Sequence, residues 1–128
     1  MKLLLDTHTF LWMDYASHKL PERTKNLLQD PNHDLFLSLA NVWEMQIKVQ
    51  LGKLQLRTAL AKVIADQQQN GVTLLPITLS HILALQSLPP HHRDPFDRLL
   101  IAQAQMEGAT LLSKDGEFSG YTVSVIWS

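Results

Sequence analysis

Four acidic residues interrupt apolar segments of the chain, and their chemistry suits the binding of a divalent cation. They are Asp6, Glu44, Asp97 and Asp115. Several carboxylates in one place repel each other and destabilise a fold unless a cation neutralises them. Ligand sets made of oxygen atoms favour Mg²⁺ or Mn²⁺ over zinc or copper. Such an ion activates water and offsets charge on a phosphate, so the pattern indicates metal-assisted hydrolysis of a phosphodiester.

Two of these acids follow apolar runs that are typical of buried strands. Asp6 comes directly after residues 2–5, and Asp115 follows residues 110–113. Each acid also has a simpler interpretation. Asp is a favoured N-cap residue, so Asp6 could cap a helix that starts near His8. The dipeptide at 115–116 is Asp-Gly, which is typical of a turn.

Glu44 lies on the apolar stripe of a predicted helix. On a helix of 3.6 residues per turn it shares one face with Ala40, Ile47 and Leu51, which places a carboxylate on the side expected to face the core. The alternative is an exposed ion pair with Lys48, four residues further on. The sequence leaves both interpretations open.

Asp97 is a second carboxylate on the apolar stripe of a predicted helix. Leu100, Ile101 and Ala104 follow it at helical spacing, so Asp97 stands at the start of an apolar stripe. Its alternative role is the N3 position of a helix capped by Asp94, where the helix dipole favours an acid. We assign the capping role to Asp94 and leave Asp97 as the candidate ligand.

The elements that must position these acids alternate along the chain. Short apolar strands that alternate with helices indicate a mostly parallel sheet covered on both faces, which is an α/β three-layer sandwich. In such sheets ligands bind at the carboxyl ends of the strands, where the four acids are expected to converge. The predicted strands are 2–5, 35–37, 72–75, 110–113 and 123–126, and the predicted helices begin near residue 8 and span 21–29, 39–50, 58–69, 79–88 and 95 to about 107.

The composition indicates one folded domain over residues 1–128. Hydrophobic residues make up 45% and charged residues 18%, which excludes a disordered tail protein. A net charge of −1 excludes a global basic field, so a nucleic-acid site must be a local patch. The absence of cysteine excludes disulfides and thiolate chemistry and favours the cytoplasm. We expect neither a signal peptide nor a membrane-spanning segment.

Four segments in order carry a further resemblance. They read LLLDTH at 3–8, SLANVWE at 38–44, DPFDRLLIAQA at 94–104 and LSKDGEF at 112–118. In order and spacing they resemble the motifs of PIN-domain nucleases. The similarity spans the whole chain and is greatest to the VapC-like toxins of bacterial type II toxin-antitoxin modules.

The resemblance implies a function and a set of site residues. It implies an endoribonuclease that depends on Mg²⁺ or Mn²⁺, leaves 5′-phosphate and 3′-hydroxyl ends, forms a homodimer and is inhibited by a small antitoxin protein. By match to the family's motifs, Asp6, Glu44 and Asp97 would be the core metal-binding acids, with Asp115 as the fourth.

Two residues depart from the family pattern. His8 stands where the family often has Asn or Ser, and Ser113 stands where Thr is frequent. The hydroxyl of Ser113 is suited to orienting Asp6 or a metal-bound water. His8 is expected to be a packed or capping residue rather than a ligand.

Several cationic and imidazole side chains are candidates for RNA contacts. A basic rim around an acidic centre would let a nearly neutral protein hold an RNA backbone. Solvated surface charge is the alternative. The candidates are Lys48, Arg98, Lys114, His91, His92 and Arg93.

Apolar surface is the signal for protein partners. The low charged fraction suggests that a second copy or an antitoxin covers part of the surface. Trp12, Trp43 and Trp127 are interpreted as core or interface residues rather than as base-stacking platforms.

Three other functions compete with an active nuclease. An aspartyl-phosphate phosphatase requires a second Asp where His8 stands. A receiver-like metal-binding module requires an acceptor Asp, and residues 50–58 contain none. A catalytically inactive PIN fold that retains its partners is compatible with every residue discussed above.

Overall fold

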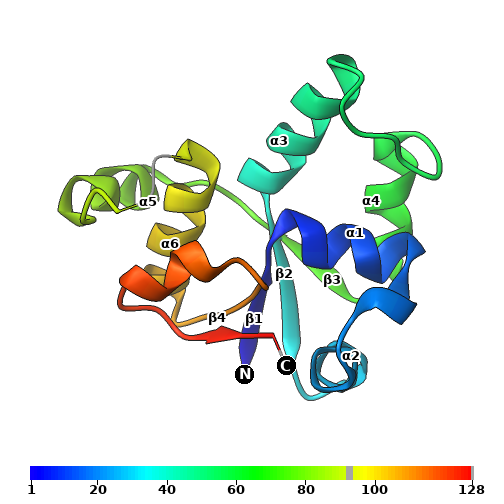
Figure 1. The fold of residues 1–128 in the computed structure, drawn as a ribbon, viewed down its shortest axis with the longest axis horizontal. Coiled ribbons are helices and arrows are strands. Elements are labelled where there is room, and N and C mark those ends of the chain that lie inside the picture. Colours follow the sequence, from blue (N-terminus) through cyan, green and yellow to red (C-terminus); the bar gives the residue numbers. More distant parts are fainter. Residues whose placement is uncertain (92–93, 128) are drawn as a thin grey trace.

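A five-stranded parallel sheet forms the centre of the computed structural model, which describes residues 1–91 and 94–127. The strands lie in the order β3-β2-β1-β4-β5, and each is parallel to its neighbours. The first strand of the chain therefore lies in the middle of the sheet (Figure 1). The strands are β1 (Lys2–Leu5), β2 (Asp34–Ser38), β3 (Val72–Leu75), β4 (Thr110–Leu112) and β5 (Val125–Ile126).

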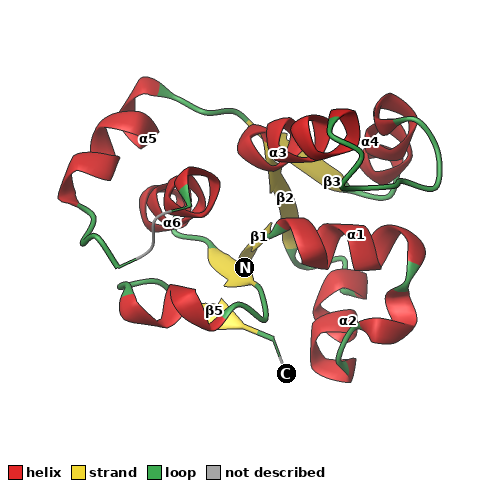
Figure 2. Cartoon of the chain, turned by 45° about the horizontal axis from the view of Figure 1, so that its top comes forward, coloured by secondary structure: helices red, strands yellow, loops and turns green. Residues whose placement is uncertain are grey.

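Helices cover both faces of this sheet. α5 and α6 lie on one face, and the first four helices lie on the other (Figures 1 and 2). The predicted α/β three-layer sandwich is confirmed. The α-helices are α1 (Thr7–Tyr15), α2 (Glu22–Gln29), α3 (Leu39–Gln50), α4 (Leu60–Gln69), α5 (Leu79–Ala84) and α6 (Pro95–Glu107).

The central strand β1 shows why two layers of helices are needed. Leu3 and Leu5 pack with Met45 of α3, whereas Leu4 between them packs with Leu100 of α6. All five of these leucine and methionine side chains are fully buried. Successive side chains of a strand point to opposite faces, so an all-leucine strand is stable only where both faces are covered.

Polar side chains fix where most of the helices begin. Asp6, Ser38, Thr78 and Asp94 each accept a hydrogen bond from a backbone N–H in the first turn of the helix that follows. Such caps satisfy amides that would otherwise lack a partner. α6 ends at Gly108, whose φ of +65° is a left-handed conformation that glycine adopts most easily.

Predicted and observed boundaries differ where elements meet loops. The predicted helix 79–88 ends as α5 at Ala84 and continues as a short 3₁₀ segment, Leu85–Ser87. Proline disfavours the helical conformation in the residue before it, and Leu88, which precedes Pro89, is extended. The predicted helix 58–69 begins two residues later, at Leu60. The predicted strand 123–126 is reduced to Val125–Ile126. The predicted turn at 115–116 is the start of a 3₁₀ helix, Gly116–Gly120.

Arg57 holds the connection between α3 and α4 against two helices. Its Nε donates to Asp14 at 2.9 Å and its Nη2 donates to Asp66 at 2.8 Å. The hydrogen bond from Arg57 is the main reason why the pKa of Asp66 lies below its ordinary value. A carboxyl with a lowered pKa stabilises the fold above its ordinary pKa, and this contribution is lost as the pH falls through the lowered value.

The parallel arrangement brings distant segments to one edge of the sheet. β1 ends beside β2 and β4, with Leu5 in register with Leu37 and Leu112. The segments that follow these three strands begin at residues 6, 39 and 113, so they start together at this edge.

Among residues 1–91 and 94–127, no helix has both the length and the apolar character needed to cross a membrane.

Candidate active site

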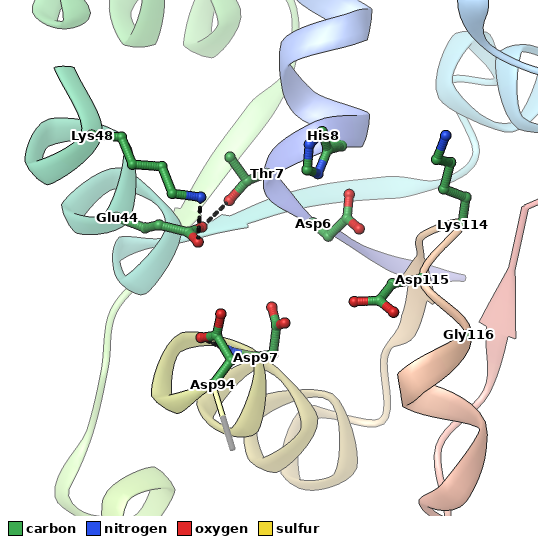
Figure 3. A pocket seen from close by; sticks show the side chains of 10 residues that line it. All are labelled: Asp6, Thr7, His8, Glu44, Lys48, Asp94, Asp97, Lys114, Asp115 and Gly116. Carbon is green, nitrogen blue, oxygen red and sulfur yellow. Dashed lines mark hydrogen bonds and ion pairs between the residues drawn. The ribbon is translucent and has the colours of Figure 1, made fainter. Parts of the chain in front are cut away.

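An acidic cleft lies at the carboxyl edge of the sheet. It has a volume of about 400 Å³, and Figure 3 shows the side chains around it. The four acids predicted from the sequence all line this cleft, although they come from segments that are far apart along the chain. Asp94 lines it as a fifth acid. The carboxylates are those of Asp6, Glu44, Asp94, Asp97 and Asp115.

Asp6 is held by contacts from two segments. Its Oδ1 accepts a hydrogen bond from the backbone N–H of Thr9 at 2.8 Å, which caps α1. Its Oδ2 accepts a hydrogen bond from the hydroxyl of Ser113, which in turn accepts the backbone N–H of Asp115 at 3.0 Å. Asp6 is therefore both a helix cap and a residue of the cleft. Ser113 orients it, in agreement with the expectation from the sequence.

Glu44 is 8% exposed and uses both of its carboxylate oxygens. Oε1 accepts a hydrogen bond from the hydroxyl of Thr7 at 2.5 Å, and Oε2 pairs with the ammonium of Lys48 at 3.1 Å. Nδ2 of Asn41 donates to the same Thr7 hydroxyl at 2.8 Å. The ion pair considered as the alternative is present, and it lies inside the cleft rather than on the open surface.

Asp94 and Asp97 divide two roles at the start of α6. Oδ1 of Asp94 accepts the backbone N–H groups of Phe96 at 2.9 Å and of Asp97 at 3.2 Å, which confirms Asp94 as the cap. Asp97 extends from the first turn of α6 toward the space below Asp6 (Figure 3). Carboxylates from α6 and from the ends of β1 and β4 thus surround one space.

Negative charge dominates the cleft. Five carboxylates line it together with two ammonium groups, those of Lys48 and Lys114. His8 also lines it and is exposed, so the expectation that His8 is a packed or capping residue was wrong. The reason is that Asp6 caps α1, which leaves the side chain of His8 on the surface of the first turn.

The donor atoms of the cleft fit a hard divalent cation. Carboxylate oxygens predominate, and no cysteine is present. Within the described ranges, no three acidic or imidazole groups lie close enough together to enclose an ion by themselves. Mg²⁺ commonly takes one or two protein carboxylates and keeps several water molecules, so this spacing suits Mg²⁺ better than a closed zinc site.

The sequence model of the PIN domain matches residues 3–123, almost the whole chain. This chain belongs to the PIN domain family. Family membership excludes the receiver-like module and the aspartyl-phosphate phosphatase considered above. No curated protein matches the chain.

Solved structures share the fold of this PIN domain over nearly its full length. VapBC2 from Rickettsia felis, bound to a DNA fragment from its promoter, has a TM-score of 0.74 at 17% identity and covers 100% of both chains. VapBC-1 from nontypeable Haemophilus influenzae has a TM-score of 0.66 at 21% identity, with 98% of this chain and 97% of that chain covered. A toxin-antitoxin complex from Klebsiella pneumoniae has a TM-score of 0.60 at 16% identity, with 97% and 95% covered. At these identities the likeness concerns the fold.

Two of the basic residues predicted to contact RNA point elsewhere in this PIN domain. The guanidinium of Arg98 donates to the carbonyl oxygens of Pro89 at 3.0 Å and Leu85 at 3.3 Å. Neighbouring residues of a helix do not share a face, so adjacency to Asp97 does not bring Arg98 to the cleft. The ring of His91 packs edge-on against Tyr121 at 5.5 Å.

The remaining basic residues fall into two groups. Lys48 and Lys114 line the cleft, as expected for a rim around an acidic centre. His92 and Arg93 lie outside the residues that the structure describes.

Thr7 and Asn41 are site residues that the sequence reasoning missed. Both are buried, and together they form a hydrogen-bonded link to Glu44. Each lies within a family-like motif, and Asn41 is a polar residue one helical turn before Glu44. That polar position in a buried helix is the signal that would have identified it.

Proposed function

We propose that this PIN domain is an endoribonuclease that hydrolyses RNA phosphodiester bonds with the help of Mg²⁺ or Mn²⁺. The observation that supports the proposal best is the convergence of Asp6, Glu44, Asp97 and Asp115 on one cleft. These acids are up to 109 residues apart in the sequence. Helix caps, turns and surface ion pairs do not require such convergence, whereas a site for a divalent cation does.

Each residue of the cleft has a defined task in this proposal. Asp6, Glu44, Asp97 and Asp115 would hold the ion, in part through water molecules that the ion keeps. The ion, when bound, would supply an activated water and offset charge on the phosphate. Two hydrogen bonds keep the carboxylate of Asp6 fixed. The N–H of Thr9 donates to Oδ1, and the hydroxyl of Ser113 donates to Oδ2.

The lysines are suited to the substrate. Lys48 and Lys114 place positive charge at the edge of a cleft that is otherwise acidic. An RNA backbone approaching five carboxylates needs such cations, because phosphate contacts supply most of the affinity for nucleic acids. Lys48 also orients Glu44 through their 3.1 Å ion pair.

We further propose that the protein is the toxin of a toxin-antitoxin pair. The support is that structural neighbours include toxin-antitoxin complexes, which favours a small antitoxin protein as partner. A homodimer is also proposed, because Trp43, Leu51 and Leu79 are 60%, 62% and 70% exposed, and exposed apolar side chains of this size favour protein contacts.

A cleavage assay with controlled metal tests the enzymatic proposal. The full chain should cleave single-stranded RNA in Mg²⁺ or Mn²⁺, should lose this activity in EDTA, and should regain it when Mg²⁺ is restored in excess. Product ends with a 5′-phosphate are expected. Cleavage that persists in EDTA would contradict metal dependence, and the absence of cleavage in every metal would indicate an inactive PIN fold.

Replacing Thr7 by Val tests the link that positions Glu44. The change removes the hydroxyl between Asn41 and Glu44, and loss of such supporting contacts typically costs about 10- to 100-fold in activity or metal affinity. It also leaves the buried Asn41 amide without its acceptor, which should lower the free energy of unfolding by about 1–3 kcal/mol. Cleavage kinetics and urea denaturation would measure the two effects.

Thr7→Ser is the matched control for this change. It keeps the hydroxyl and should retain most of the activity and stability. A loss in Thr7→Ser without a loss in Thr7→Val would show that the methyl group of Thr7, and not its hydrogen bonds, is what matters.

A further inference from the structure

Two tryptophans form an aromatic pair beside the acidic cleft. The ring centroids of Trp12 and Trp127 lie 5.8 Å apart, with an angle of 51° between the ring planes. Both side chains are half-buried, so part of each indole is open to solvent. One lies on α1 and the other follows β5, so the fold brings together residues from the two ends of the sequence.

Two lysines accompany these rings. Nζ of Lys114 lies 4.9 Å from the centroid of the Trp12 ring, and Nζ of Lys19 lies 5.6 Å from it. Both lysines are exposed. Within residues 1–91 and 94–127 neither lysine forms a salt bridge, so both ammonium groups are available to contact a phosphate. We call these four residues the Trp12 platform.

The Trp12 platform is continuous with the cleft. Lys114 belongs to both, since it lines the cleft and lies over the Trp12 ring. Figure 3 shows its side chain extending away from the carboxylate of Asp115, on the same side of the cleft as His8. His8 precedes Trp12 by four residues on α1, so the two share one face of that helix.

Buried contacts hold the platform in place. The carbonyl oxygen of Trp127 accepts a hydrogen bond from the hydroxyl of Thr24, which is fully buried on α2. Trp12 is fixed by α1, whose N-cap is Asp6 itself. A ligand on the platform would therefore be aligned with the cleft by rigid elements.

We propose that the Trp12 platform binds single-stranded RNA next to the cleavage site. An unpaired base stacks on the exposed indole surface while Lys114 and Lys19 contact the adjoining phosphates. The proposal rests on the nuclease function proposed above, and it adds a site for nucleotides that are not themselves cleaved.

The energies of the contacts favour this occupant. Stacking of a nucleic-acid base on an aromatic side chain is generally stronger than the contact of an exposed lysine with the same ring. A base can therefore displace the ammonium of Lys114 from Trp12, and the freed lysine then lies next to a phosphate. Unpaired bases stack on aromatic side chains in most single-stranded RNA complexes, whereas paired bases are not accessible to them.

Binding measurements without turnover test the proposal. The probe is a fluorescein-labelled, unstructured RNA oligonucleotide, with binding followed by anisotropy in EDTA. Trp12→Ala should weaken binding at least about fivefold, the lower end expected for loss of one stacked base. Trp12→Phe should restore much of the affinity. Lys19→Gln, which alters an exposed side chain outside the cleft, should weaken binding and reduce its dependence on salt by about one phosphate contact.

A matched control comes from a residue away from the platform. Lys2 is an exposed lysine at the opposite end of β1. Lys2→Gln should leave RNA affinity unchanged.

Cleavage of two substrates in Mg²⁺ separates the platform from the cleft. Trp12→Ala and Lys19→Gln, which change residues that do not line the cleft, should raise KM for a long RNA with little change in kcat. A substrate too short to reach from the cleft to the platform should be cleaved equally by these variants and by the unaltered chain.

Three results would overturn the inference. If the unaltered chain cleaves RNA and both variants bind RNA normally, the platform proposal is wrong while the nuclease proposal stands. If the variants lose affinity for a protein partner and keep their affinity for RNA, the platform is a protein-docking surface. If the unaltered chain neither binds nor cleaves RNA, both proposals fail together.

Discussion

Asp6→Asn should lower the rate of Mg²⁺-dependent RNA cleavage roughly a thousandfold, which corresponds to about 4 kcal/mol in the activation barrier. Asp6 ends the central strand, and both of its oxygens are held in place at the cleft. The amide lacks the negative charge that attracts the cation and retains only one acceptor oxygen.

The same substitution should leave the fold intact. Asn is as good an N-cap as Asp, so its oxygen can still accept the N–H of Thr9. Its amide N–H can donate to Ser113, whose oxygen has a free lone pair. Thermal unfolding and circular dichroism would check this, and Asp34→Asn, at the exposed amino end of β2, is a matched control. Full activity in Asp6→Asn would end the assignment of this cleft as the active site.

Replacing Asp97 should affect mainly the cleavage activity, whereas replacing Asp94 should affect mainly the stability of the fold. Asp97→Asn should abolish most of the cleavage, because Asp97 extends into the cleft, where the ion is proposed to bind. The free energy of unfolding of the Asp97→Asn variant should change little. The substitution relieves repulsion among the carboxylates, which offsets the lost interaction of Asp97 with the N-terminus of α6. Cleavage kinetics and urea denaturation of the same preparations would measure both properties.

Asp94→Ala should show the opposite pattern. The change removes the cap of α6, which accepts two backbone N–H groups, and should lower the free energy of unfolding by about 1 kcal/mol. Asp94→Asn keeps a capping oxygen and should retain both stability and most of the activity. A loss of activity in Asp94→Asn as large as that in Asp97→Asn would assign Asp94 to the metal site as well.

Local chemistry in the sequence was sufficient to predict much of this fold. The leucines at 3–5 are buried on both sides, and a strand of that composition can only lie inside a covered sheet. Ser38, Asp94 and Gly108 are residues whose preferences fix helix ends, and the structure uses each of them in that way. The convergence of the acids followed from topology, because parallel strands end at one edge.

Features that depend on contacts across the fold were not predictable. The direction of Arg98 is set by carbonyl oxygens in the preceding loop, and the exposure of His8 is set by the cap that Asp6 provides. The sequence favours a core or interface position for Trp12 and Trp127, and the structure adds that they are half-buried and lie together. Their contact joins segments more than one hundred residues apart, which no local pattern specifies.

The place of β4 in the sheet determines when the cleft is complete during synthesis. β4 pairs with the central strand β1, and Asp115 follows it near the end of the described chain. A ribosome that has released only residues 1 to 100 has produced β1, β2 and β3 but neither β4 nor Asp115. The cleft that we propose as the active site is therefore incomplete in a nascent polypeptide until almost the whole domain has emerged.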